Sequence, residues 1–178
     1  MAPACALAAT ARPDVVDTSI AEADGGPILR QSIVIKTPRT AVWRAFTTTE
    51  GLRAWESPVV AIDLKVGCMM EDSYDPKGKL GDPGNIKNEI LGFLPEELLV
   101  MRNVQSPPDF TYKDAFQRMT TLVQFEGAGE GLTRVTVSIV GFDAGRASEA
   151  LYRFFGAGDA YELEALKAYL EGTPAPAE

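Results

Sequence analysis

A long C-terminal stretch without proline is the feature that most constrains the fold. The stretch 148–171 predicts a helix of about 36 Å, with Ser148 as its N-cap and Gly172 as its end. At 100° per residue, one face of this helix collects Leu151, Phe155, Gly158, Ala165, Leu166 and Tyr169. A helix of this length with one apolar face needs a matching surface, so we expect it to lie along a sheet.

The preceding chain shows the patterns of one strand, two short helices and then further strands. Alternating residues predict a strand over 28–36, Thr37 predicts the cap of a helix that runs to Phe46, and Thr49 predicts the cap of a helix over 50–55. The further strands are expected at 59–64, 68–74, 86–94, 98–103, 117–125 and 133–142. Turn residues separate nearly all of these runs, so the sheet is predicted to be antiparallel and the fold class α+β.

Composition excludes several classes of function. The chain has 178 residues, which favours a single domain, and a formal net charge of −8, which disfavours nucleic acids and anionic membrane surfaces as partners. It contains no histidine, so neither a Ser-His-Asp triad nor a His-containing zinc site is available. Its two cysteines, Cys5 and Cys68, form no Cys-x-x-Cys motif, and no stretch is long and apolar enough to span a membrane. We therefore expect neither a metal nor another cofactor.

The two ends of the chain have a different character from the middle. Residues 1–27 are interpreted as a disordered leader or the remnant of a signal peptide, because Ala6-Leu7-Ala8 has the small-x-small form of a cleavage site. An export signal has Lys or Arg before its apolar run, and this sequence has neither there. The protein is expected to be soluble, exported if the leader is a signal peptide and cytoplasmic otherwise. Residues 173–178 predict a disordered tail.

Several short motifs occur in a definite order along the chain. The opening is Ile33-Val34-Ile35-Lys36-Thr37-Pro38-Arg39-Thr40-Ala41-Val42-Trp43-Arg44-Ala45-Phe46-Thr47, followed by Thr49-Glu50-Gly51-Leu52-Arg53-Ala54-Trp55. Further matches are Val66-Gly67, Leu94-Pro95-Glu96-Glu97-Leu98, Gly131-Leu132-Thr133-Arg134-Val135, and the pattern of Gly158, Tyr161, Leu163 and Leu166. In this order the motifs resemble the SRPBCC superfamily, and specifically its branch of homologues of the heat-shock protein ATPase activator. The resemblance implies a START-like helix-grip domain over 28–172, in which a curved antiparallel sheet wraps around the long helix.

This resemblance also implies a cavity between the sheet and the long helix that receives a small apolar molecule. We therefore expect non-enzymatic binding of a hydrophobic or amphipathic ligand. Large rings beside Gly158 on the helix face, and methionines on the strands, are suited to such a site. The expected ligand-binding residues are Trp55, Met70, Tyr74, Met101, Met119, Val123, Phe154, Phe155, Gly158, Tyr161 and Glu162.

Three other interpretations compete with ligand binding. The same residues could fill an ordinary core, or the chain could be a protein-interaction module, as family members that act on a chaperone ATPase are. A third alternative is a cyclase or hydrolase that uses carboxyl groups such as Glu162 or Asp72 in a cavity. Glu162 projects near the middle of the apolar helix face, where it would be buried with a raised pKa unless it is solvated or pairs with Arg118 or Arg102.

The loop over 72–85 is longer and more polar than the family pattern. Glu71, Asp72, Asp75 and Asp82 could supply oxygen ligands to a cation, but their spacing does not match an EF-hand loop. The Asp-Pro and Pro-Gly pairs favour turns instead. The Gly-rich stretch 127–131 predicts a hairpin and lacks the spacing of a dinucleotide site.

Overall fold

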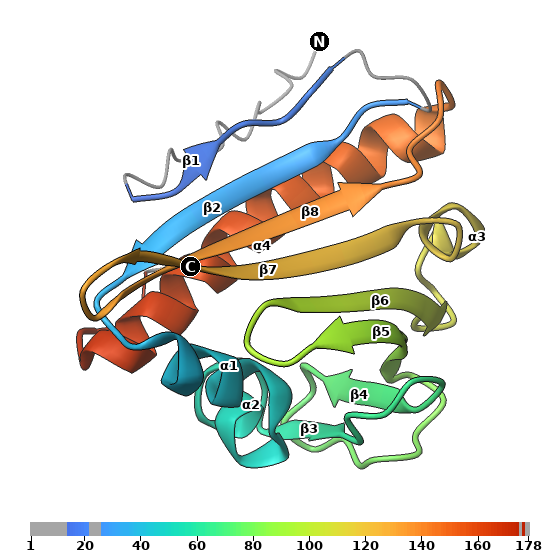
Figure 1. Cartoon of the computed structure of the whole chain (residues 1–178). Coiled ribbons are helices and arrows are strands. Elements are labelled where there is room, and N and C mark those ends of the chain that lie inside the picture. The colour runs from blue at the N-terminus through green and yellow to red at the C-terminus, as the bar shows by residue number, and fades with distance from the viewer. Residues whose placement is uncertain (1–13, 22–25, 175, 177–178) are drawn as a thin grey trace, which may run out of the picture.

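The computed structural model describes residues 14–21, 26–174 and 176. Its strands form an eight-stranded antiparallel sheet in the order β1-β2-β8-β7-β6-β5-β4-β3, and α4 lies along one face of it (Figure 1). The strands are β1 (Val16–Asp17), β2 (Leu29–Ile35), β3 (Val59–Ile62), β4 (Met69–Ser73), β5 (Ile86–Leu94), β6 (Leu98–Gln105), β7 (Thr120–Gly129) and β8 (Leu132–Val140). The helices are α1 (Arg39–Thr47), α2 (Thr49–Trp55), α3 (Lys113–Phe116) and α4 (Arg146–Glu171). The predicted α+β helix-grip architecture is confirmed.

One pairing in the sheet joins elements that are far apart in the chain. β2 pairs with β8 from Leu29↔Ile139 to Ile35↔Thr133, so the first long strand lies beside the last. In β5, irregular register between Ile90 and Gly92 inserts an extra residue, a bulge that increases the local bend of a strand. This long-range closure places the concave face of the sheet opposite α4.

α1 and α2 meet at a tight corner that depends on two residues. Thr48 is the N-cap of α2, and its hydroxyl accepts a hydrogen bond from the backbone N–H of Gly51 at 3.0 Å. The predicted cap, Thr49, is instead the first helical residue, and its hydroxyl accepts from the N–H of Ile62. Gly51 packs directly on α1, because a Cβ placed there would lie 2.5 Å from the carbonyl oxygen of Arg44.

α4 is longer at its start than predicted and ends where predicted. Its N-cap is Gly145 rather than Ser148, and the Ser148 hydroxyl donates to Asp143 Oδ1 and accepts from the Asp143 N–H. Gly172 closes the helix in the left-handed conformation with φ 66°, which glycine adopts without strain. Tyr169, expected on the inner face, is exposed instead, whereas Leu166 is fully buried.

Two apolar clusters fill the space around α4. The larger cluster packs α1 and α2 against the sheet and the second half of α4, with Trp43, Phe46 and Leu166 among its members. The smaller cluster lies near the beginning of α4 and contains Leu151 and Met119. The short helix α3, which the sequence did not predict, joins this smaller cluster through Ala115 and delays the start of β7 from residue 117 to Thr120. The two clusters leave room for a cavity between them.

Part of the predicted leader is paired with the sheet. β1 lies beside β2 with Val16 opposite Ser32, and Ile20 forms a bridge with Ile28. Residues 1–13, which include Ala6-Leu7-Ala8, lie outside the described residues, as do residues 175, 177 and 178 of the predicted tail. The interpretations as leader and tail therefore stay predictions.

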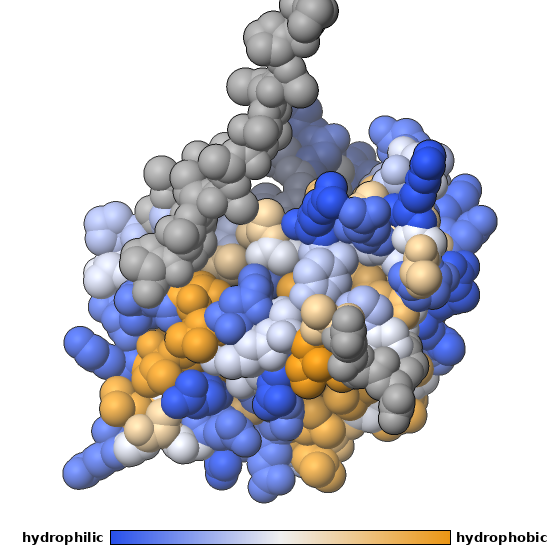
Figure 2. Space-filling model, turned by 90° about the horizontal axis from the view of Figure 1, so that it is seen from above, coloured by the Kyte–Doolittle hydropathy of each residue, from blue (hydrophilic) through white to orange (hydrophobic). Residues whose placement is uncertain are grey.

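Polar and apolar side chains are both present on the surface of the molecule. Seen from above, it is mainly hydrophilic, with apolar areas between polar side chains (Figure 2). No helix among the described residues is long and apolar enough to cross a bilayer.

Candidate functional site

A cavity of about 480 Å³ lies between the sheet and α4. This volume is within the range of sites that hold small organic ligands. Its walls come from α1, α2, several of the strands, α3 and α4. They are formed by Phe46, Trp55, Glu56, Met70, Asp72, Tyr74, Ile86, Asn88, Met101, Ser106, Pro107, Phe110, Phe116, Thr121, Val123, Val137, Ile139, Phe154, Phe155, Gly158, Asp159, Tyr161, Glu162 and Ala165.

One end of the cavity is aromatic. The rings of Phe116 and Phe155 pack in a tilted arrangement with their centroids 4.7 Å apart, and the centroids of Phe110 and Phe154 are 6.0 Å apart. Phe154 is 60% exposed although it lines the cavity, so it lies at an opening. Next to these rings, Gly158 leaves open space, since a Cβ at this position would meet no atom within 4 Å. The aromatic end therefore has rigid walls and a gap in the helix face.

The sheet supplies an apolar floor. Met70, Met101 and Val123 are buried on strands of the sheet, and all three line the cavity. Methionine side chains are flexible and polarisable, so they adapt to the shape of a bound group. Trp55 contributes from α2, and its indole N–H is already used by a hydrogen bond to the carbonyl of Ala45 at 3.0 Å. Its ring therefore offers apolar contact without an unsatisfied donor.

The other end of the cavity is acidic. Glu56 follows α2, Asp72 lies on β4, and Asp159 and Glu162 lie on α4, three residues apart and hence on one side of the helix. Removal from water raises the pKa of all four carboxyl groups, because a buried charge is poorly solvated. The pKa of Asp72 rises to about 7, with Glu162 adding to the effect of burial.

Glu162 is the centre of this acidic end. The Tyr74 hydroxyl donates a hydrogen bond to Glu162 Oε1 at 2.9 Å, and Glu162 also raises the pKa of Glu56 and Asp159 through repulsion between like charges. The arginine partners considered from the sequence are wrong. Arg118 pairs with Asp143 at 3.2 Å, and Arg102 pairs with Glu89 at 2.9 Å.

Two carboxylate oxygens at this end have no partner. Glu56 Oε2 and Asp159 Oδ2 are buried without a hydrogen bond to any described residue. Neither residue was among the candidates from the sequence. The spacing of Asp159 and Glu162 on the predicted helix was an available signal, whereas Glu56 is brought in only by the tertiary packing of α2.

Ten of the eleven candidate ligand-binding residues surround the cavity, and Met119 does not. Met119 is buried in the smaller apolar cluster near Phe142 instead. Its position follows from α3, because the chain leaves this helix just before Met119 and enters β7 only at Thr120. Whether the other ten bind a ligand stays a prediction.

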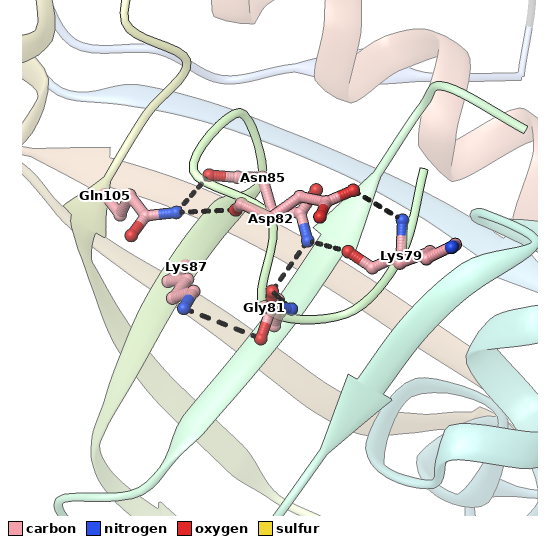
Figure 3. A network of polar contacts seen from close by, with 7 residues as sticks. Lys79, Gly81, Asp82, Asn85, Lys87 and Gln105 are labelled. Atoms are coloured by element: carbon pink, nitrogen blue, oxygen red, sulfur yellow. Dashed lines mark hydrogen bonds and ion pairs between the residues drawn. The ribbon is translucent and has the colours of Figure 1, made fainter. Parts of the chain in front are cut away.

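The acidic loop after β4 holds itself together through its own carboxylates (Figure 3). Glu71 Oε1 accepts hydrogen bonds from Gly81 N–H and from the Asn85 amide, both at 2.6 Å, and Asp82 Oδ2 accepts from Lys79 N–H at 2.8 Å. The side chain of Gln105 on β6 donates to the carbonyl of Asn85 at 2.9 Å. Within the part of the chain that is described, no group of acidic or cysteine side chains is arranged to hold a metal ion.

A family model described as "Activator of Hsp90 ATPase homolog 1-like protein" matches residues 36–171. The chain belongs to this family. The match includes all four helices and the strands from β3 to β8, and it begins just after β2. The sequence resemblance is therefore confirmed, while the family alone does not identify a ligand or a partner.

Several solved structures share the fold of this chain. The Aha1 dimer from Colwellia psychrerythraea has a TM-score of 0.64 at 16% identity, with 81% of this chain and 96% of that chain covered. CalU16 from Micromonospora echinospora has a TM-score of 0.60 at 16% identity, with coverage of 88% and 85%. An Hsp90 activator from Plasmodium falciparum has a TM-score of 0.50 at 17% identity, with coverage of 66% and 75%. No curated protein matches the sequence.

Proposed function

We propose that this protein binds a small amphipathic molecule in the cavity between its sheet and α4, without catalysing a reaction. The observation that carries the proposal is the cavity of about 480 Å³, which separates two packed apolar clusters and is aromatic at one end and acidic at the other. An empty apolar space of this size costs stability, because its lining atoms lose packing contacts. A ligand with an apolar body would restore those contacts.

The experiment uses the neutral fluorescent probe N-phenyl-1-naphthylamine, whose emission rises in apolar surroundings. The wild-type protein is expected to take it up with a stoichiometry of about one. Gly158→Trp should reduce uptake by about tenfold or more, because the position faces open space and an indole there fills the cavity. Circular dichroism confirms that the variant is folded.

Ala157→Trp is the matched control. Ala157 is the neighbour of Gly158 on α4, it is exposed, and it does not line the cavity. Probe uptake by this variant should equal that of the wild type. Full uptake by a folded Gly158→Trp protein would show that the ligand does not enter this cavity, and no uptake by the wild type would contradict binding itself.

Acid catalysis is the second candidate, and one observation favours it. Asp72 has a pKa of about 7, so its carboxyl group holds and releases a proton near neutrality, as a general acid must. This candidate predicts turnover of a bound substrate with a rate that depends on Asp72. Mass spectrometry of a ligand recovered after incubation distinguishes the two, since a binding protein returns the ligand unchanged.

Membership of the family of Hsp90 ATPase activator homologues supports a third interpretation, in which a chaperone ATPase is the partner. This interpretation requires an exposed surface rather than a cavity. The Gly158→Trp variant separates the two, because it should leave such a surface largely intact while it blocks the cavity.

A further inference from the structure

We propose that the ligand is a cationic amphiphile, with a protonated amine at the acidic end of the cavity and an apolar body at the aromatic end. This inference rests on the proposed function and specifies the chemical class of its ligand.

The geometry of the acidic end suits an ammonium group. Glu56, Asp159 and Glu162 converge on the cavity from α2 and α4, and the first two each present a buried oxygen without a partner among the described residues. A primary ammonium carries three N–H donors and no acceptor. It can therefore satisfy the two orphaned oxygens and one oxygen of Glu162 together.

The charges around the acidic end leave it without a cation of its own. Among the described residues, no lysine or arginine lines the cavity. Arg53 on α2 donates to the carbonyl of Val60 at 3.2 Å, and Lys87 on β5 pairs with Glu71 at 3.7 Å.

The titratable groups that face Glu162 are acidic or phenolic. They are Glu56 from α2, Asp72 from β4, Tyr74 from the segment after β4, and Asp159 and Tyr161 from α4 itself. Glu71 adds a further negative charge behind Asp72 and raises its pKa. A ligand cation would therefore supply the positive charge that the described residues around Glu162 do not provide.

Other head groups fit less well. A carboxylate or phosphate ligand would add negative charge where like charges already repel each other. A hydroxyl group would form hydrogen bonds but would leave the repulsion among the carboxylates unchanged. The net charge of −8 also favours the approach of cations over anions.

Cation binding must release protons. Without ligand, burial raises the pKa of these carboxyl groups and so favours their protonated forms, and Asp72, with a pKa of about 7, is partly protonated near neutrality. An adjacent ammonium favours the ionised forms instead. The affinity for an amine should therefore rise between about pH 6 and about pH 8, as competition from protons falls. A neutral ligand should show no such rise.

The test compares three probes that share one apolar chain, namely decylamine, decan-1-ol and decanoate. Isothermal titration calorimetry at about pH 7.5 should give an affinity for decylamine at least about tenfold higher than for decan-1-ol, and decanoate should bind most weakly. Titrations in buffers of different ionisation enthalpy should show release of protons with decylamine and none with decan-1-ol.

Amide variants identify the residues that cause the preference for decylamine over decan-1-ol. Glu162→Gln and Glu56→Gln should each lower the affinity for decylamine by about tenfold and change that for decan-1-ol by less than about twofold. Glu164→Gln is the matched control, since Glu164 lies on α4 and does not line the cavity. It should bind all three probes as the wild type does.

The outcomes separate this inference from the proposed function. If decan-1-ol or decanoate binds as tightly as decylamine, or if the amide variants keep the preference, the cationic class is wrong although the cavity still binds ligands. If none of the three probes binds and N-phenyl-1-naphthylamine is also not taken up, both proposals are wrong.

Discussion

Asp72 shows how a single buried carboxyl group ties the stability of the fold to pH. Its side chain is almost fully enclosed on β4, and its pKa is about 7 instead of 3.8. A group whose pKa is raised by folding stabilises the native state at low pH, and this contribution is lost as the pH rises through the native value. The free energy of unfolding should therefore fall between about pH 4 and about pH 7.

Asp72→Asn should remove the part of this dependence that comes from Asp72. The variant is expected to be more stable than the wild type at pH 8, by up to about 4 kcal/mol, because the amide carries no charge to desolvate. Urea unfolding of both proteins at pH 5 and pH 8 measures the difference. Asp109→Asn, at an exposed position, serves as control, and equal pH slopes for Asp72→Asn and the wild type would contradict the account.

The candidate site could be predicted from the sequence only where residues share one element. The 3.6-residue period over α4 is sufficient to place Phe154, Phe155, Gly158 and Glu162 on the inner side of the helix. The partner of Glu162 could not be found in this way. Tyr74 lies 88 positions away and reaches it only through the curvature of the sheet.

The corner between α1 and α2 leaves little room for substitution. Gly51 lies within van der Waals distance of the α1 backbone, and Thr48 fixes the start of α2. Because both contacts involve backbone atoms, neighbouring side chains cannot move to relieve a clash. The corner positions Trp55 and Glu56 at the cavity.

Gly51→Ala should lower the free energy of unfolding by about 1–3 kcal/mol, because the added Cβ would lie 2.5 Å from a carbonyl oxygen and force the two helices apart. Thermal unfolding followed by circular dichroism measures the loss.

Gly158→Ala is the matched control, since this glycine is also helical and its Cβ would meet no atom. Here alanine should stabilise the protein by about 0.5–1 kcal/mol, through its higher helix propensity. If Gly51→Ala left the free energy of unfolding unchanged, the corner would be less tightly packed than its geometry indicates.

The sequence predicted most elements because local pattern and tertiary context agree in them. β5 was predicted with its observed bounds, Ile86–Leu94, since turn residues mark both ends. α3 was missed because it is a single turn, too short for a helical period to be visible, and it is held by the packing of Ala115 against its apolar cluster. The cap of α2 is Thr48 rather than Thr49, since neighbouring threonines offer the same capping hydroxyl. α4 begins at Gly145 without a side-chain cap, and the hydroxyl of the predicted cap, Ser148, bonds to Asp143 instead.

At the scale of the molecule, α4 is the part common to both apolar clusters. Leu163 and Leu166 belong to the larger cluster and Leu151 to the smaller one. A rigid helix that is packed at both ends should make the two clusters unfold together, although a cavity separates them.

Leu151→Ala tests this connection. Both tryptophans of the chain, Trp43 and Trp55, pack in or against the larger cluster, so their fluorescence reports on the end of the molecule remote from Leu151. The substitution should destabilise the fold by about 2–5 kcal/mol and shift the fluorescence transition by as much as the transition seen by circular dichroism. Two separate transitions would show that the clusters unfold independently.

Because α4 follows all eight strands in the chain, it is the last of these elements to be made during synthesis. Until then the part of the concave face that α4 packs on has no cover, and β2 must also wait for β8 before it gains its long partner. The nascent polypeptide thus passes through a stage in which apolar side chains are exposed to water. The chamber is enclosed only after α4 has been synthesised.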